Sequence, residues 1–450
     1  MTEDDRSITK RAFLMTASTV YLSGCLGDSP SQSSSQKTSS QEVKNNTDTD
    51  PEPTTEAEPD SSTLFIDGDP REDLWDVGDQ WRTGTSLDEW DVLSGSIERS
   101  TERLYRGFQS VHLTATDDDG VAVRIPIDGY DLTQTSFSLA MYIDTPGTHY
   151  TPSFDVNAPE CGQTLEFRTR YKIDEPGWIR YDLGINDIST LESATESYMT
   201  ISWGGSDIDW YISDLRAVPV NQDPRLFIQF DDSLRSTYDT AFPIMRQYDV
   251  PATVYTVTDR IGNTGSLTLD QMNEMQDAGW EFASHTLTHQ RTGELPLDEQ
   301  RAELEDSKRW LLDHGFEQAA SMLAYPFGSF TTETMDIAAD YYDFATSEQR
   351  GAMNRRISSP LSVNRHPGDN VKRSMELIDL LLDDQIPTDT LVLCYHDVIE
   401  DNDPSVDPDG FRETMAYIDD QDVDCRVTSE LRDDQFRSEN SSSSPNPKND

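Results

Sequence analysis

Hydrophobic and polar positions alternate in two different ways along this 450-residue chain. Between residues 63 and 220 apolar residues recur at every second position in short runs such as VAVRIPI and SFSLAMYI, which Gly, Asp, Asn and Pro turns separate. A period of two is typical of half-buried strands, and no run here sustains the 3.6-residue period of a helix. The pattern predicts an all-β sandwich of jelly-roll type over residues 63–220.

From residue 221 to 433 short apolar runs alternate with amphipathic segments. The predicted strands are LFIQF, ATVYTV, WEFAS, MLAY, FAT, LSV, TLVLCY and CRVTS. The predicted helical stretches include Tyr238–Tyr248, Leu267–Ala278, Leu297–His314 and Val371–Asp383. This alternation predicts a parallel sheet with helical crossovers, and eight strands in about 210 residues fit a compact, distorted (β/α) barrel.

The first 25 residues have the features of an export signal. Lys10 and Arg11 precede an apolar run, Ala12–Leu22, that is too short to span a bilayer. The run TKRAFLM resembles a twin-arginine motif with Lys10 in the place of the first arginine. LSGC, which ends at Cys25, resembles a lipobox, and this implies cleavage before Cys25 and lipid attachment to its thiol. The alternative is an ordinary signal peptide with a chance cysteine.

Residues 26–62 are mostly Ser, Thr, Glu, Asp and Pro. Such a segment cannot bury a core, so we expect a flexible spacer, and we expect the tail 434–450 to be disordered too. Together with the lipobox, the spacer predicts an exported protein at the cell surface, lipid-anchored to the outer face of the membrane. Contact with the membrane would then be made only through the lipid.

The 85 acidic and 35 basic residues give a formal charge of −50. This charge repels nucleic acid and anionic lipid surfaces, so we expect neither as a partner. A disordered chain could carry it, but the many apolar strand patterns indicate folded cores. A spread excess of acid favours a halophilic protein from a very salty milieu, where ions screen the repulsion.

Four cysteines are too few for a disulfide framework. Cys25 is explained by the lipobox, and Cys161 stands alone in the sequence. Cys394 and Cys425 could form a disulfide only if their strands are neighbours.

Two segments of the second half carry the candidate chemistry. Asp231 and Asp232 end the strand LFIQF, and His285 and His289 lie in HTLTH, directly after the strand WEFAS. Neutral imidazoles and a carboxylate form a facial metal site with open positions, and a second carboxylate could take a proton from a bound water. The alternative is a solvated acidic turn with incidental histidines. With only seven histidines in the chain, we favour the metal site.

These segments resemble the first two motifs of the polysaccharide deacetylases, the NodB-homology group or carbohydrate esterase family 4. The resemblance covers about residues 225–433. It implies that Asp231 is the general base and that Asp232, His285 and His289 hold one divalent metal, usually zinc.

His396 follows the strand TLVLCY and, with Leu393, matches the L-x-x-H motif of that family. The resemblance implies that His396 is the general acid, a role that suits a side chain with a reference pKa near 6.5. Active sites of parallel barrels lie at the C-terminal ends of the strands. Asp231, His285 and His396 all follow predicted strands, so they fall on one rim.

The run AYPFG occupies the place of the family motif R-x-P-[YF]. Pro326 and Phe327 match the motif, and with Tyr325 we expect them to form a wall of the substrate groove, where a loop N–H could help to stabilise an oxyanion. Ala324 replaces an arginine that orients the catalytic aspartate in many members. Arg365 could add charge to the groove rim, or it could be an ordinary surface residue. We interpret His314 and His366 as surface residues.

The resemblance implies a hydrolase that removes acetyl groups from an N-acetylated extracellular polysaccharide and releases acetate. One alternative is an O-acetyl esterase on acetylated polymers such as xylan, and another is a non-catalytic, lipid-anchored glycan-binding protein. Trp75, Trp81, Trp90 and Tyr105 of the β-rich half could stack against sugars, although such aromatic residues more often fill a sandwich core.

Overall fold

The computed structural model describes residues 64, 79–80, 87–116, 118–127, 129–144, 152–168, 173–191, 196–205, 207–221, 223–347, 351–400 and 405–437. The predicted export signal with Cys25, the spacer, residues 438–450 of the tail, Trp75 and Trp81 lie outside these residues. Residues 434–437 of the predicted tail end helix α8 (Thr428–Arg437), where Gln435 is buried, so the prediction of disorder is wrong for them. Within the described ranges, no helix combines the length and the hydrophobicity that crossing a membrane requires.

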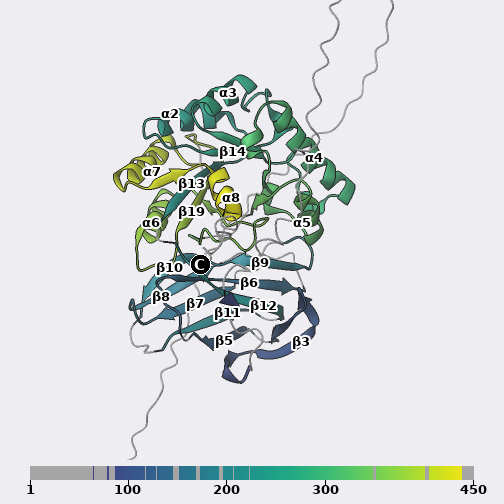
Figure 1. Cartoon of the computed structure of the whole chain (residues 1–450), viewed down its shortest axis with the longest axis vertical. Coiled ribbons are helices and arrows are strands. Elements are labelled where there is room, and N and C mark those ends of the chain that lie inside the picture. The colour runs from purple at the N-terminus through teal and green to yellow at the C-terminus, as the bar shows by residue number, and fades with distance from the viewer. Residues whose placement is uncertain are drawn as a thin grey trace, which may run out of the picture. The chain divides into compact units, whose positions relative to one another are not determined.

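The N-terminal part consists of two antiparallel sheets of six strands each (Figure 1). One has the order β3-β4-β12-β6-β9, with β1 beside β12, and the other the order β10-β8-β7-β11-β5-β2. The strands are β1 (Asp79–Gln80), β2 (Asp91–Ser94), β3 (Ser96–Tyr105), β4 (Phe108–Ala115), β5 (Val121–Pro126), β6 (Thr135–Ile143), β7 (Ser153–Ala158), β8 (Gln163–Arg168), β9 (Trp178–Asp182), β10 (Gly184–Thr190), β11 (Tyr198–Trp203) and β12 (Ile208–Pro219).

The two sheets share one apolar core. Buried and half-buried residues alternate along β5, as the period of two predicts. Between the sheets, the ring of Phe137 on β6 lies 5.9 Å from that of Phe167 on β8, and the rings of Phe154 and Trp210 lie 6.3 Å apart. Trp90 is only 6% exposed and belongs to this core, so it fills the interior and offers no surface for a sugar.

The C-terminal part is built on an eight-stranded sheet with the order β17-β16-β15-β14-β13-β19-β18, in which β20 also pairs with β13. Each pair of neighbouring strands in this sheet is parallel, as predicted. Its strands are β13 (Arg225–Phe230), β14 (Thr253–Thr256), β15 (Glu281–Ser284), β16 (Met322–Ala324), β17 (Phe344–Thr346), β18 (His366–Pro367), β19 (Thr390–Tyr395) and β20 (Asp424–Arg426). Between the two end strands, an isolated bridge joins Thr346 to Val363.

Helices connect most of these strands. They are α2 (Phe242–Met245), α3 (Leu269–Asp277), α4 (Leu297–Asp313), α5 (Thr332–Ala339), α6 (Val371–Leu382), α7 (Pro408–Asp420) and α8 (Thr428–Arg437). Side chains at the N-termini of α3, α5, α6 and α7 satisfy free backbone N–H groups. Thr268 and Gln271 form a capping box on α3, and Asp407 accepts from two N–H groups of α7.

Three predicted elements differ from the structure. LSV is not a strand, because only Val363 makes a bridge, and the strand of this region is β18, three residues later. CRVTS is divided between β20 and α8. The predicted helix Tyr238–Tyr248 is a π-helical turn, η3 (Thr237–Ala241), followed by the short α2.

Cys394 and Cys425 do not form a disulfide. Cys394 on β19 faces Gln229 of β13, and Cys425 on β20 faces Leu226 of the same strand. Both of their strands pair with β13, and among the described residues neither of them nor Cys161 is in a disulfide.

Candidate active site

The candidate catalytic residues follow the C-terminal ends of neighbouring parallel strands. Asp231 and Asp232 follow β13, His285 follows β15, and His396 follows β19. The register places Phe230 opposite Tyr395, and the Asp231 N–H donates to the Tyr395 carbonyl at 3.0 Å. The parallel ladder thus brings Asp231 and His396 to the same edge, although 165 residues separate them in the sequence.

Asp232, His285 and His289 form a cluster in which one ligand atom from each lies within 4.8 Å of the others. Asp232 Oδ1 is 2.8 Å from His289 Nε2 and 3.9 Å from His285 Nε2. Bonds of 2.0–2.2 Å to a tetrahedral ion require ligand separations of about 3.4 Å, which lies between these distances. Asp232 Oδ1 is also buried, and Arg260 Nη1 lies 3.5 Å from it. The donor set fits one divalent cation.

The tautomer and charge of His285 suit a metal ligand. Its Nδ1 lies 2.7 Å from the Ala324 carbonyl, so Nδ1 carries the proton and Nε2 is left to face Asp232. Burial lowers the pKa of His285 to about 4, although Asp231 and Asp232 oppose this shift. The ring is therefore neutral at physiological pH, the state that a metal ligand needs.

The backbone around this cluster is strained. Asp232 has a φ of 71°, Thr286 of 64° and His289 of 68°. Residues other than glycine seldom adopt this left-handed region, which costs roughly 1–2 kcal/mol for each one. This conformation turns the side chains of two ligands toward the third.

Asp231 is fixed by a buried arginine. Its carboxyl is 1% exposed, and its two oxygens accept from Arg365 Nη1 and Nη2 at 2.8 and 2.7 Å. Burial alone would raise the pKa of Asp231, but the charge of Arg365, with smaller contributions from His285 and His396, holds it well below its usual range. Asp231 is therefore a permanently ionised carboxylate in a fixed orientation.

Arg365 is not on the groove rim as the sequence suggested, because it is 5% exposed and lies against Asp231. The Arg365 guanidinium contacts Asp231, the aspartate that the motif arginine orients in related sequences. The motif position itself holds the uncharged Ala324. No local pattern of the sequence indicates this pairing, since the two residues are 134 positions apart.

His396 is more exposed to solvent than the other candidate catalytic residues. Its side chain is 43% exposed, and its Nε2 lies 3.9 Å from Asp231 Oδ2, too far for a direct hydrogen bond. The neighbouring Asp397 accepts a hydrogen bond from Ser236. His396 can thus reach solvent or a substrate on one side while it stays beside Asp231.

Only one residue of the predicted groove wall reaches the surface. Phe327 is 43% exposed with a φ of 58°, its ring lies 4.7 Å from that of His289, and the Arg291 guanidinium lies 4.7 Å from the ring centre. Pro326 is buried, and Tyr325 is buried against Phe330. Tyr325 and Pro326 are therefore interior residues of the loop. Of the three, only Phe327 has an exposed ring beside the cluster of metal-ligand candidates.

The remaining histidines are split between surface and interior. His314 is exposed, as expected, and its Nδ1 lies 2.7 Å from the Trp310 carbonyl. His366 is 7% exposed, so its assignment to the surface is wrong. Its position in β18, paired with β19, explains its burial.

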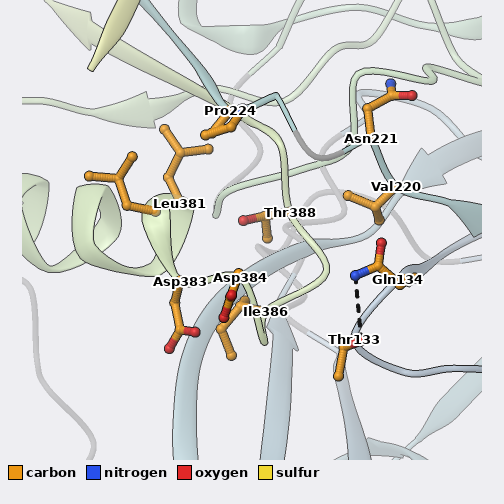
Figure 2. Close-up of a pocket in the computed structure, with 11 residues that line it drawn as sticks. Thr133, Gln134, Val220, Asn221, Pro224, Leu381, Asp383, Asp384, Ile386 and Thr388 are labelled. Carbon is orange, nitrogen blue, oxygen red and sulfur yellow. Dashed lines mark hydrogen bonds between the residues drawn. The ribbon is translucent and has the colours of Figure 1, made fainter. Parts of the chain in front are cut away.

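A cavity of about 210 Å³ lies away from this site (Figure 2). Its lining includes Pro224, directly before β13, and Thr388, two residues before β19. Asp231 and His396 follow the opposite ends of the same six-residue strands, about 20 Å along the sheet. The cavity therefore belongs to the other edge of the sheet.

Comparisons with known proteins agree with the motifs. Residues 220–342 match the family model described as polysaccharide deacetylase. YxkH of Bacillus subtilis (strain 168), whose name describes a polysaccharide deacetylase, is 33% identical over 131 residues, 29% of this chain and 47% of that protein. The poly-beta-1,6-N-acetyl-D-glucosamine N-deacetylase of Staphylococcus epidermidis is 32% identical over 116 residues, 23% of this chain and 40% of that protein.

Among solved structures, the Streptococcus pyogenes deacetylase PplD in complex with acetate is 32% identical, with 31% of this chain and 62% of that chain covered and a TM-score of 0.28. The chain spans less than half the length of the two curated relatives. The sequence matches support a polysaccharide deacetylase domain of the NodB, carbohydrate esterase family 4 type. The family model covers Asp231 to Phe327, whereas Arg365 and His396 lie beyond its end at residue 342.

Proposed function

We propose that this protein is a metal-dependent hydrolase that removes acetyl groups from an N-acetylated extracellular polysaccharide. One observation carries the proposal: a cluster of Asp232, His285 and His289 lies beside an arginine-paired Asp231 and the open His396. The name of the Staphylococcus epidermidis relative favours an N-acetyl substrate. We further propose that the site lies on a distorted (β/α) barrel and that the part preceding it in the sequence is a jelly-roll-like sandwich.

The donor set of one carboxylate and two imidazoles favours zinc. Asp232, His285 and His289 would hold the ion, which when bound supplies polarisation of the acetyl carbonyl and acidification of water. The remaining work belongs to residues of the chain. Phe327 offers an apolar face against which a sugar ring can be oriented beside His289.

Asp231 and His396 divide the proton transfers. Asp231 is ionised throughout the physiological range, so it can accept a proton from the attacking water, and Arg365 holds its two oxygens in place. His396 then donates a proton to the leaving nitrogen, and its exposure allows it to exchange with solvent. Acetate and a free amine leave the site.

The direct test is acetate release from N-acetylglucosamine oligomers and from acetylated xylan in molar salt, with and without a chelator. We expect release from the N-acetyl oligomers, loss of it on chelation and recovery with added zinc. The Asp231→Asn variant, purified in the same way, controls for contaminating hydrolases. Release from xylan alone would support an O-acetyl esterase, and release from neither substrate would support a non-catalytic glycan-binding protein.

We also propose that the protein is exported and held at the cell surface by a lipid on Cys25. The run LSGC before a long polar spacer supports this proposal. Mass spectrometry of the mature protein is expected to find Cys25 at the N-terminus with a diacylglycerol-type mass increase. An unmodified Cys25, or a mature chain that lacks it, would contradict the anchor.

The charge of −50 predicts a dependence of stability on salt. Repulsion among acidic groups opposes the folded state, and at molar ionic strength the screening length shortens to about 3 Å. We expect the melting temperature to fall on transfer from molar to low salt. An unchanged or higher melting temperature in low salt would refute the halophilic interpretation.

A further inference from the structure

The segment 358–364, which leads into Arg365, is hydrogen-bonded to strand β9 of the N-terminal part and, through Pro360 and Val363, to Ala345 and Ser347. The Asp182 carboxyl accepts from the Ser358 N–H at 2.9 Å, the Ser358 hydroxyl at 2.5 Å and the Ser359 N–H at 3.2 Å. The Asp182 carbonyl accepts from Asn364 Nδ2 at 2.8 Å. Asp182 of β9 is therefore hydrogen-bonded to both ends of the segment.

Arg180, two residues earlier on β9, also holds the start of the segment. Its Nε donates to the Ser358 hydroxyl at 2.9 Å. Its Nη1 and Nη2 donate to Asp214 and Ser138, both at 2.7 Å, so the guanidinium is fixed from the sheet side. Arg180 is 5% and Asp182 8% exposed, so both hydrogen-bond sets are shielded from water.

The end of this segment is joined to the proposed catalytic base, Asp231, through Arg365. Asn364 is 2% exposed and directly precedes Arg365, which donates to both oxygens of Asp231. A two-point pair of this kind tolerates little displacement, and a misplacement of about 1 Å can cost roughly 10²-fold in rate. Backbone bonds to Ala345 and Ser347 hold Pro360 and Val363 in the middle of the segment, and the contacts with β9 hold its two ends.

A second contact of the N-terminal part reaches the groove loop. Ser329 donates to the Asp174 carboxyl at 2.5 Å, and the Asp174 N–H donates to the Phe330 carbonyl at 3.1 Å. Ser329 and Phe330 follow Phe327 by two and three residues. The N-terminal part thus touches both loops that carry Arg365 and Phe327.

We propose that the N-terminal β-rich part is a positioning component of the catalytic unit and that Asp182 is its main positioning residue. The Asp182 carboxyl holds Ser358 and Ser359 and its backbone carbonyl holds Asn364, and through this segment both act on Arg365 and on the orientation of Asp231. This inference rests on the proposed function where Asp231 is the base. It assigns the N-terminal part a role that does not depend on sugar binding.

The kinetic test compares Asp182→Ala with wild type and with Arg373→Ala. Arg373 on α6 donates to the Asn186 carbonyl on β10, so it also joins the two parts but leads to no catalytic residue. We expect Asp182→Ala to lower kcat about 10-fold with KM and zinc content unchanged. Arg373→Ala is expected to retain wild-type kcat. Equal kcat for all three proteins would overturn the proposal.

A double-mutant cycle separates positioning from general loss of stability. If Asp182 acts through Arg365, the Asp182→Ala change should have little further effect on kcat in an Arg365→Ala background. Asp182→Asn retains one acceptor oxygen and should recover part of the kcat. If Asp182→Ala lowers kcat by the same factor with and without Arg365, Asp182 does not act through Arg365.

Hydrogen exchange provides a measurement that needs no substrate. We expect amides of residues 358–365 to exchange faster in Asp182→Ala than in wild type and in Arg373→Ala. If Asp182→Ala does not fold, Ser358→Ala removes one donor and serves in its place. Wild type that releases no acetate would overturn the proposed function, whereas unchanged exchange in residues 358–365 would overturn the positioning role.

Discussion

Replacement of Asp231 by asparagine is expected to leave the metal bound and to reduce turnover by about 10²–10⁴-fold, the usual range for loss of a general base. Asp231 Oδ2 lies 3.7 Å from His285 Nε2, but its two oxygens are committed to Arg365. An amide in this place retains an acceptor for one guanidinium nitrogen and cannot accept the proton. The three metal ligands are unchanged, so the metal should stay bound, but the buried Arg365 charge loses its partner and the variant should be less stable than wild type by about 3–5 kcal/mol.

Asp232→Asn should fail in a different way. Asp232 contributes Oδ1 to the cluster, and a neutral amide oxygen is a weaker ligand, so metal affinity should fall and excess zinc should restore part of the turnover. Asparagine tolerates the φ of 71° at this position, so the backbone should not change. The measurement is zinc content beside kcat for each variant. A metal-free Asp231→Asn with a metal-loaded Asp232→Asn would reverse the two assignments.

Replacement of Arg365 by alanine is expected to destabilise the protein by about 3–5 kcal/mol, the usual cost of leaving one member of a buried ion pair alone. Asp231 is 1% exposed, so water cannot replace the lost guanidinium. Turnover should also fall, because the carboxylate loses its orientation. Urea unfolding is the measurement, with Arg356→Ala as the control. Arg356 is exposed in the same segment, so its change should stay within about 0.5 kcal/mol.

The destabilisation of Arg365→Ala should depend on pH. In wild type the pKa of Asp231 is depressed, so the pair stabilises the fold above the unfolded pKa near 3.9 and loses this effect as the pH falls through the folded value. Without Arg365, burial raises the pKa of Asp231, and protonation relieves the buried charge. The free-energy difference between variant and wild type should therefore shrink as the pH falls. A difference that is constant or grows toward acid pH would contradict this account.

The fold was predictable where a strand and its neighbours form a continuous ladder. LFIQF, WEFAS and TLVLCY are buried runs that correspond to β13, β15 and β19 within one residue at each end. LSV has the same local composition, yet it is not a strand, because only Val363 bonds to the neighbouring residues Ala345 and Ser347, while the Ser362 hydroxyl donates to the Arg180 carbonyl of β9, 182 residues earlier. A local pattern carries no information about such a distant partner.

The same limit applies to the site. Asp232, His285 and His289 belong to compact motifs, and the parallel strands bring them together as the sequence predicts. Tyr325 was misplaced because a motif position does not reveal the direction of a side chain, which here stacks on Phe330. The pairing of Arg365 with Asp231 depends on the whole fold, so only coordinates reveal it.

The contacts of β9 also bear on the order of folding. The hydrogen bonds from Asp182 and Arg180 join residues 176 to 182 positions apart in the sequence. Non-local contacts form late, because the entropy of closing a long loop is lost before they can stabilise the chain. The N-terminal sheets leave the ribosome first, so they would act as a template for the later segment. The base should acquire its final orientation among the last steps of refolding, after the sheets and the metal ligands are in place.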